Sequence, residues 1–173
     1  MQPGFNRLAW DLANLYLAGL GAPLLGRTAL QIVGLSEETR CYISAEYFAD
    51  SDPFADFIVH EVAHIFHNCK RTTLAVRTTR NKEWLLDIDF RKRETFAYSC
   101  EAYSRILKRA KSLAERRALA EEYGRTLWIS DKRVDSAEVS EIVREAALVR
   151  NGWKSILARC AHARHHPGKS AAI

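Results

Sequence analysis

The stretch FIVHEVAHIFH, residues 57–67, decides how this 173-residue sequence is interpreted. It places His60, Glu61 and His64 in the pattern H-E-x-x-H. On an α-helix, residues four positions apart differ by about 40° in direction and about 6 Å along the axis. The imidazoles of His60 and His64 can therefore bind one tetrahedral zinc ion from the same side. Glu61 points to the flank of that face, where it can act on a water at the metal without being a ligand.

A third histidine of this stretch, His67, cannot belong to the same site. On a helix it lies about 20° from His60 around the axis but about 10 Å along it, too far for both to bind one ion. We place His67 on the cleft wall or on the surface.

The residues before the motif predict where its helix begins. Asp52 is a favourable N-cap, Pro53 fits the first helical position, and Asp56 suits the positive end of a helix dipole. We therefore predict a helix over about residues 53–68. The apolar residues between the histidines would bury its other sides.

A catalytic zinc ion needs a third protein ligand and leaves its fourth position to water. In one class of site this ligand is a histidine six residues after the second histidine, and a glycine precedes it. Here those positions hold Lys70 and His67, which excludes that class. The alternative is a glutamate on a later helix, and residues 93–106, RETFAYSCEAYSRI, offer Glu94 and Glu101. These two glutamates lie on nearly the same helix face, two turns apart.

Over about residues 41–106 the chain resembles the gluzincins, zinc metallopeptidases whose H-E-x-x-H helix is completed by a downstream glutamate. In several of those families the glutamate opens a helix in an E-x-F-A pattern, which residues 94–97, ETFA, reproduce. The resemblance implies Glu94 as the third zinc ligand. Glu101 stays the competing candidate for that position, and its other interpretation is a group that orients a histidine. The gap from His64 to Glu94 is longer than in the best-known gluzincins and requires an inserted loop or hairpin.

The same resemblance implies a fold and a reaction. The expected fold is α+β, a mostly helical zincin-like domain with a small antiparallel β-sheet before the catalytic helix. The expected reaction is hydrolysis of a peptide bond by a zinc-activated water, with Glu61 as the general base. The substrate oxyanion needs a hydrogen-bond donor. Tyr98, one turn beyond Glu94, is our candidate for this catalytic role, and the other candidates are Tyr103, Tyr47 and His67.

Two short segments before the motif predict a β-hairpin. TALQIV, residues 28–33, and CYISAEYF, residues 41–48, are rich in β-branched or aromatic residues, and the polar stretch GLSEET, residues 34–39, separates them. In zincins the strand before the catalytic helix commonly pairs with the extended substrate, so residues 41–48 are the expected substrate edge.

Apolar residues at helical spacing predict the remaining elements. The expected helices are a first helix over about residues 5–20, a long helix over 91–123, a helix from the capping box at Asp135 and Glu138 to about 149, and a final helix over 153–162. We expect residues 1–165 to form one domain and residues 166–173 to be a flexible tail.

Composition limits the location and the partners. The four cysteines are scattered without a C-x-x-C pair, which favours reduced thiols and a cytoplasmic location, although delivery as a secreted effector or toxin stays open. No uninterrupted apolar run could span a bilayer, so we expect no membrane partner. The expected partner is a peptide or protein substrate.

Two alternatives remain at this point. The chain could be a zinc-binding regulatory or protein-interaction module with little or no turnover. It could also be associated with nucleic acid through a basic loop near the motif, given a net charge of +5. No aromatic-basic recognition motif accompanies that charge, which disfavours nucleic acid. The basic residues in question are Lys70, Arg71, Arg77, Arg80, Lys82 and residues 91–93.

Overall fold

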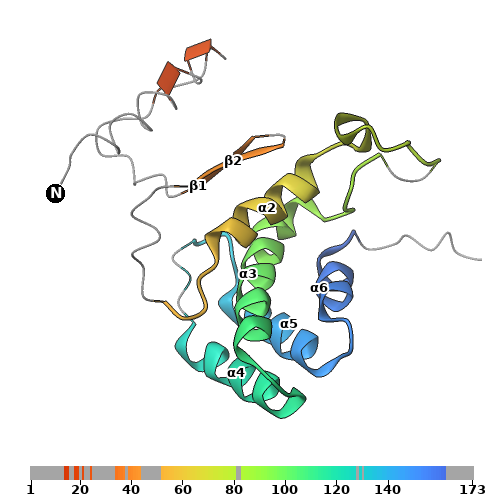
Figure 1. The fold of residues 1–173 in the computed structure, drawn as a ribbon. Coiled ribbons are helices and arrows are strands. Elements are labelled where there is room, and N and C mark those ends of the chain that lie inside the picture. Colours follow the sequence, from red (N-terminus) through yellow and green to blue (C-terminus); the bar gives the residue numbers. More distant parts are fainter. Residues whose placement is uncertain are drawn as a thin grey trace, which may run out of the picture.

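The computed structural model describes residues 52–80, 83–127, 129 and 131–162, together with residues 14–15, 18–19, 21, 24, 34–37 and 39–43. This part of the chain is mostly helical, as the sequence predicts (Figure 1). Its helices are α2 (Phe57–Asn68), α3 (Arg93–Arg109), α4 (Leu113–Thr126), α5 (Ser136–Leu148) and α6 (Gly152–Cys160). The shorter elements are β1 (Gly34–Glu37), β2 (Arg40–Ile43) and the 3₁₀ segments η2 (Arg71–Leu74) and η3 (Phe90–Lys92).

Helix α3 occupies the centre of the fold and contacts α2, α4, α5 and α6 (Figure 1). Its Phe96 and Cys100 belong to a core cluster with Ile142 of α5 and Ile156 of α6. Its Ile106 faces a second cluster around Val143 of α5. Burial of α3 on several sides fixes the direction of every side chain along it, including the two glutamates.

Small residues lie where α2 meets α3. Ala63 of α2 and Ala97 of α3 belong to the same buried cluster, and Ala97 is fully shielded from solvent. Side chains of this size allow two helices to approach closely. The contact brings the histidine face of α2 next to the first turns of α3.

The helix that carries the histidines begins later than predicted. Asp56, not Asp52, is its N-cap: the Asp56 carboxylate accepts a hydrogen bond from the backbone N–H of Val59 at 3.4 Å. Asp52 instead accepts from the N–H of Phe54, within the turn that precedes the helix. Both aspartates suit a cap by residue type, so local sequence did not distinguish them.

The predicted long helix over residues 91–123 is wrong, because the chain forms α3 and α4 with a break between them. Ala110 is extended, and the Ser112 side chain caps α4 by accepting from the N–H of Glu115 at 3.1 Å. Gly124, the residue after the predicted end of that helix, lies inside α4. The helix predicted from Asp135 and the final helix are confirmed as α5, which Asp135 caps, and α6.

The predicted hairpin is shifted along the sequence. β1 and β2 pair antiparallel, with Gly34 opposite Ile43 and Glu37 opposite Arg40. Residues 34–37, expected as the turn, therefore form a strand. Residues 28–33 and 44–48 lie outside the described residues, as do most of the predicted first helix and the whole predicted tail.

The segment between α2 and α3 forms a loop whose later residues lie back against the end of α2. The backbone N–H of Arg71 donates to the carbonyl of Glu83 at 2.8 Å, and that of Leu86 donates to Phe66 in the last turn of α2. Lys70 forms a 3.0 Å ion pair with Glu83. This closed loop accommodates the long gap between the motif and Glu94 without moving α3 away from α2.

Gly152, the first residue of α6, permits a close approach to α3. A Cβ atom at this position would overlap the Tyr103 ring and the carbonyl oxygen of Ala146. We expect Gly152→Ala to lower the free energy of unfolding by about 1–3 kcal/mol, the usual cost of overpacking a filled core. Urea unfolding measures this loss. Lys154→Ala, at an exposed position of the same helix, is the control, and an equal loss in both variants would contradict the prediction.

Among the described residues, no helix is long and apolar enough to cross a membrane.

Candidate metal centre

Three side chains from two helices converge on one point. The Nε2 atoms of His60 and His64, one turn apart on α2, lie 3.3 Å from each other. The Oε2 atom of Glu94, in the first turn of α3, lies 3.2 Å from Nε2 of His64 and 3.7 Å from Nε2 of His60. The structure thus brings together the three residues predicted as metal ligands.

The spacing of these atoms fits a zinc ion. In a tetrahedral site with zinc bonds of about 2.0–2.1 Å, neighbouring ligand atoms lie about 3.3–3.4 Å apart. The three separations, 3.2, 3.3 and 3.7 Å, lie around that value. Two imidazoles and one carboxylate also form the donor set of several catalytic zinc sites. The three residues therefore form a cluster that could hold a metal ion, and their donor atoms are those of a zinc site.

The electrostatics of the cluster favour positive charge. Burial lowers the pKa of His60, but hydrogen bonds to Glu101 and Glu94 outweigh it and raise this pKa to about 9. Hydrogen bonds from His60 and His64 hold the pKa of the Glu94 carboxyl well below its usual range. The carboxylates of Glu94 and Glu101 thus stabilise the protonated His60 ring between them, and a metal ion at Nε2 would take the place of the proton there.

Glu101, the alternative third ligand, lies on the other side of the His60 ring. Its Oε2 atom is 3.0 Å from Nδ1 of His60, and its Oε1 atom accepts a 2.7 Å hydrogen bond from the backbone N–H of Asp56. A carboxylate at Nδ1 holds the proton there and leaves the Nε2 lone pair for a metal. This is the orienting position that the sequence allowed for Glu101.

Asp56 links the start of α2 to the far half of α3. Its Oδ1 atom caps α2, and its Oδ2 atom accepts from Nζ of Lys108 at 2.8 Å and from Oγ of Ser104 at 3.5 Å. With Glu101, these contacts fix the rotation of α2 against α3, and this rotation decides where His60 points.

We expect Glu101→Gln to weaken zinc binding by about 10–100-fold, the usual effect of losing a group that orients a ligand. A glutamine fills the same space, but its one oxygen cannot accept from both His60 Nδ1 and the Asp56 N–H. Competition with a chromophoric chelator measures the affinity. Glu115→Gln, at the exposed start of α4, is the control. Unchanged affinity in Glu101→Gln would show that Glu101 does not orient His60.

The second oxygen of Glu94 contacts two arginines, of which Arg133 was not among the basic residues noted near the motif. Oε1 lies 3.4 Å from Nε of Arg93 and 3.5 Å from Nη2 of Arg133. Arg133 comes from the loop before α5, where it is held by a two-pronged contact with Asp131. No local pattern marks this loop, because the contact with Glu94 exists only after α5 packs on α3.

The predicted catalytic residues lie beside the cluster. The ring of Tyr98 packs edge to face on the ring of His60, with centroids 4.6 Å apart, and burial raises the pKa of Tyr98 to about 12. Glu61 follows His60 on α2 and is half-buried. The catalytic roles of Glu61 and Tyr98 stay predictions.

The other residues considered as oxyanion donors lie in different places. His67 is half-buried, burial and the neighbouring His64 lower its pKa, and its Nε2 atom is shielded from solvent without a hydrogen-bond partner. It does not join the three-residue cluster. Tyr103 is buried against Trp153 of α6, more than two turns beyond Glu94. Tyr47 lies outside the described residues.

Comparison with known proteins gave no relative: no family model, no curated protein and no solved structure matches this chain.

Proposed function

We propose that this protein is a zinc-dependent hydrolase of peptide bonds, similar in its site to the gluzincins. The observation that carries the proposal is the convergence of His60, His64 and Glu94 at the spacing of a tetrahedral zinc site, with Glu61 next to the first ligand. A structural zinc site uses four protein ligands, whereas a catalytic one uses three. The described residues supply three at this cluster.

Several residues of the chain would have separate roles in hydrolysis. Bound zinc supplies Lewis acidity, which lowers the pKa of a water and polarises a carbonyl group. Glu61 takes the proton of the attacking water and delivers it to the amine that leaves when the C–N bond breaks. Glu101 holds the proton on Nδ1 of His60, and Arg93 with Arg133 holds the outer oxygen of Glu94. Tyr98 is the proposed donor to the oxyanion.

The proposal includes a zincin-like arrangement with an extended edge beside the metal helix. The strands β1 and β2 precede α2 and contact it, which supports this part of the proposal (Figure 1). A peptide or protein substrate would then lie extended along β2 and across the cluster.

The test combines metal analysis with an unbiased search for cleavage. Purified protein should contain one zinc ion per chain, and a peptide library should be cut by the native protein but not after treatment with a chelator. Added zinc should restore cleavage. Protein that neither carries nor takes up zinc would disprove the proposal. Tight zinc binding without cleavage of any peptide would favour the alternative, a zinc-binding interaction module.

A further inference from the structure

A second concave site lies toward the other end of α3. It is a cavity of about 540 Å³ where the C-terminal half of α3, the first turns of α4 and the start of α6 meet. The residues that line it include Tyr103, Leu107, Arg116, Arg150 and Trp153. Tyr103 lies nine residues beyond Glu94, which is about 13 Å along the helix. This cavity shares no residue with the metal centre.

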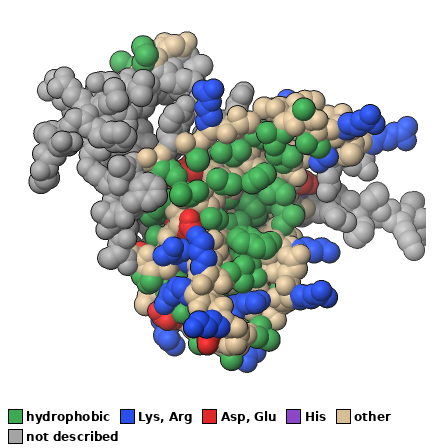
Figure 2. All heavy atoms as spheres, in the orientation of Figure 1, with side chains coloured by type: hydrophobic (Ala, Val, Ile, Leu, Met, Phe, Trp, Pro, Cys, Tyr) green, Lys and Arg blue, Asp and Glu red, His purple; other side chains and the backbone are tan. Residues whose placement is uncertain are grey.

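One wall of the cavity is aromatic and apolar. Tyr103 and Trp153 pack edge to face with centroids 4.9 Å apart, and Trp153 is 43% exposed, so part of the indole stays open. Leu107 is half-buried beside them. Figure 2 shows hydrophobic side chains gathered over the middle of this face of the molecule, with Lys and Arg side chains around its lower part. A flat ring could pack on such a wall.

The other wall carries two guanidinium groups, those of Arg116 and Arg150. No carboxylate lines the cavity, and neither Arg116 nor Arg150 forms an ion pair within the described part of the chain. The Nε atom of Arg116 is shielded from solvent and has no hydrogen-bond partner. A shielded donor without an acceptor costs free energy, which a bound anion would recover once the Arg116 side chain turned its Nε atom toward the cavity.

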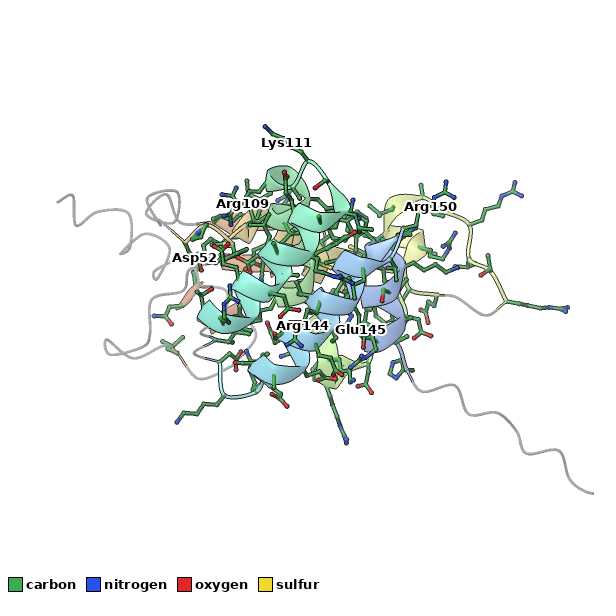
Figure 3. The ribbon with its side chains drawn as sticks, turned by 90° about the horizontal axis from the view of Figure 1, so that it is seen from below. Asp52, Arg109, Lys111, Arg144, Glu145 and Arg150 are labelled. Carbon is green, nitrogen blue, oxygen red and sulfur yellow. The ribbon has the colours of Figure 1, made fainter. Side chains whose placement is uncertain are left out.

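Two arginines elsewhere on these helices are paired with glutamates. Arg144 of α5 pairs with Glu121, and Arg159 of α6 pairs with Glu141 and Glu145. Figure 3 shows Arg150 beyond the end of α5 and well apart from Glu145. Within the described residues, Arg117 and Arg125 of α4 and Lys154 of α6 also form no ion pair. The cavity is therefore distinguished by its two arginines together with the shielded Nε atom of Arg116.

We propose that this cavity binds an aromatic phosphomonoester, with the ring against Trp153 and the phosphate between Arg116 and Arg150. A phosphomonoester carries about −1.5 to −2 charges at neutral pH, which matches two guanidinium groups. Guanidinium groups bind phosphate oxygens through paired hydrogen bonds. The volume lies within the range of about 300–1,000 Å³ that is usual for small-ligand sites. A phosphate ion alone would leave the aromatic wall uncovered.

The test is calorimetric titration of the full-length chain with four probes: adenosine 5′-monophosphate, phenyl phosphate, adenosine and inorganic phosphate. At least one aromatic phosphate should bind saturably and at least about 10-fold more tightly than adenosine or inorganic phosphate. Tighter binding of the nucleotide would identify a nucleotide site, and tighter binding of phenyl phosphate a site for phosphorylated tyrosine. The proposal is wrong if neither aromatic phosphate binds, or if inorganic phosphate binds equally well.

Substitutions test whether the aromatic phosphate binds in this cavity. Arg116→Ala and Arg150→Ala should each weaken it at least about 10-fold, and Trp153→Ala should remove the preference for the aromatic ligand. Arg117→Ala, an exposed neighbour on α4 that does not line the cavity, should leave it unchanged. His64→Ala should also leave it unchanged, which separates this site from phosphate bound at the metal centre. An equal loss in Arg117→Ala, or loss of binding in His64→Ala, would overturn the proposal.

Discussion

Replacement of Glu61 by glutamine is expected to lower the rate of peptide hydrolysis by about 10²–10⁴-fold, the contribution of a general base, while zinc stays bound. Glutamine has the size and the hydrogen-bonding reach of glutamate but cannot take a proton at neutral pH. Because Glu61 is not one of the three converging residues, its loss should leave metal binding intact. The proton transfer is therefore the step that the substitution removes.

The measurement pairs the rate of cleavage of a peptide found in the library screen with the zinc content of the same sample. Glu83→Gln is the matched control, because Glu83 lies exposed in the loop after α2 and pairs with Lys70. It should keep both the rate and the metal. Full activity in Glu61→Gln would exclude Glu61 as the general base. It would not contradict the proposed zinc ligands, which the zinc content tests separately.

Loss of the second histidine is expected to remove stoichiometric zinc. His64 lies closest to Glu94, 3.2 Å from its Oε2 atom, so His64→Ala leaves two of three protein donors. Loss of an orienting group costs about 10–100-fold in metal affinity, and loss of a direct ligand should cost more than about 100-fold. Elemental analysis after dialysis should find one zinc ion in the native protein and almost none in the variant.

His67→Ala is the control for this experiment. His67 lies on the same helix one turn later, and it does not join the cluster. The variant should therefore keep one zinc ion per chain. If zinc is lost equally from both variants, the ion is bound elsewhere or His67 is a ligand, and the proposed donor set is wrong. Circular dichroism of both variants shows whether α2 has formed.

Some features of this protein follow from local sequence. The H-E-x-x-H spacing predicts that His60 and His64 face the same way, because the helix repeat alone sets that direction. The cap at Asp135 and the period of the apolar residues likewise predict α5. Where the apolar pattern continued through residues 110–112, it predicted a single helix and missed the break, since Ser112 can either continue a helix or cap one.

The metal centre as a whole depends on tertiary structure. Glu94 and Glu101 share one face of α3, so helix geometry could not choose between them. The choice follows from the way α2 lies against α3, which places Glu94 at the Nε2 atoms and Glu101 at Nδ1 of His60. Small residues at the helix contact and the hydrogen bond from Asp56 to Glu101 fix that packing.

The contacts made by loops were the least predictable. Arg133 reaches Glu94 only because α5 packs on α3. Arg116 and Arg150 line one cavity only because α4 and the turn between α5 and α6 both lie beside Tyr103 of α3. The sequence by itself determined which residue types were available and which side of a helix they occupy. The packing of one helix on another determined which of these residues come into contact. The helical repeat relates residues within one helix only, so it cannot predict contacts between residues that lie on different helices or loops.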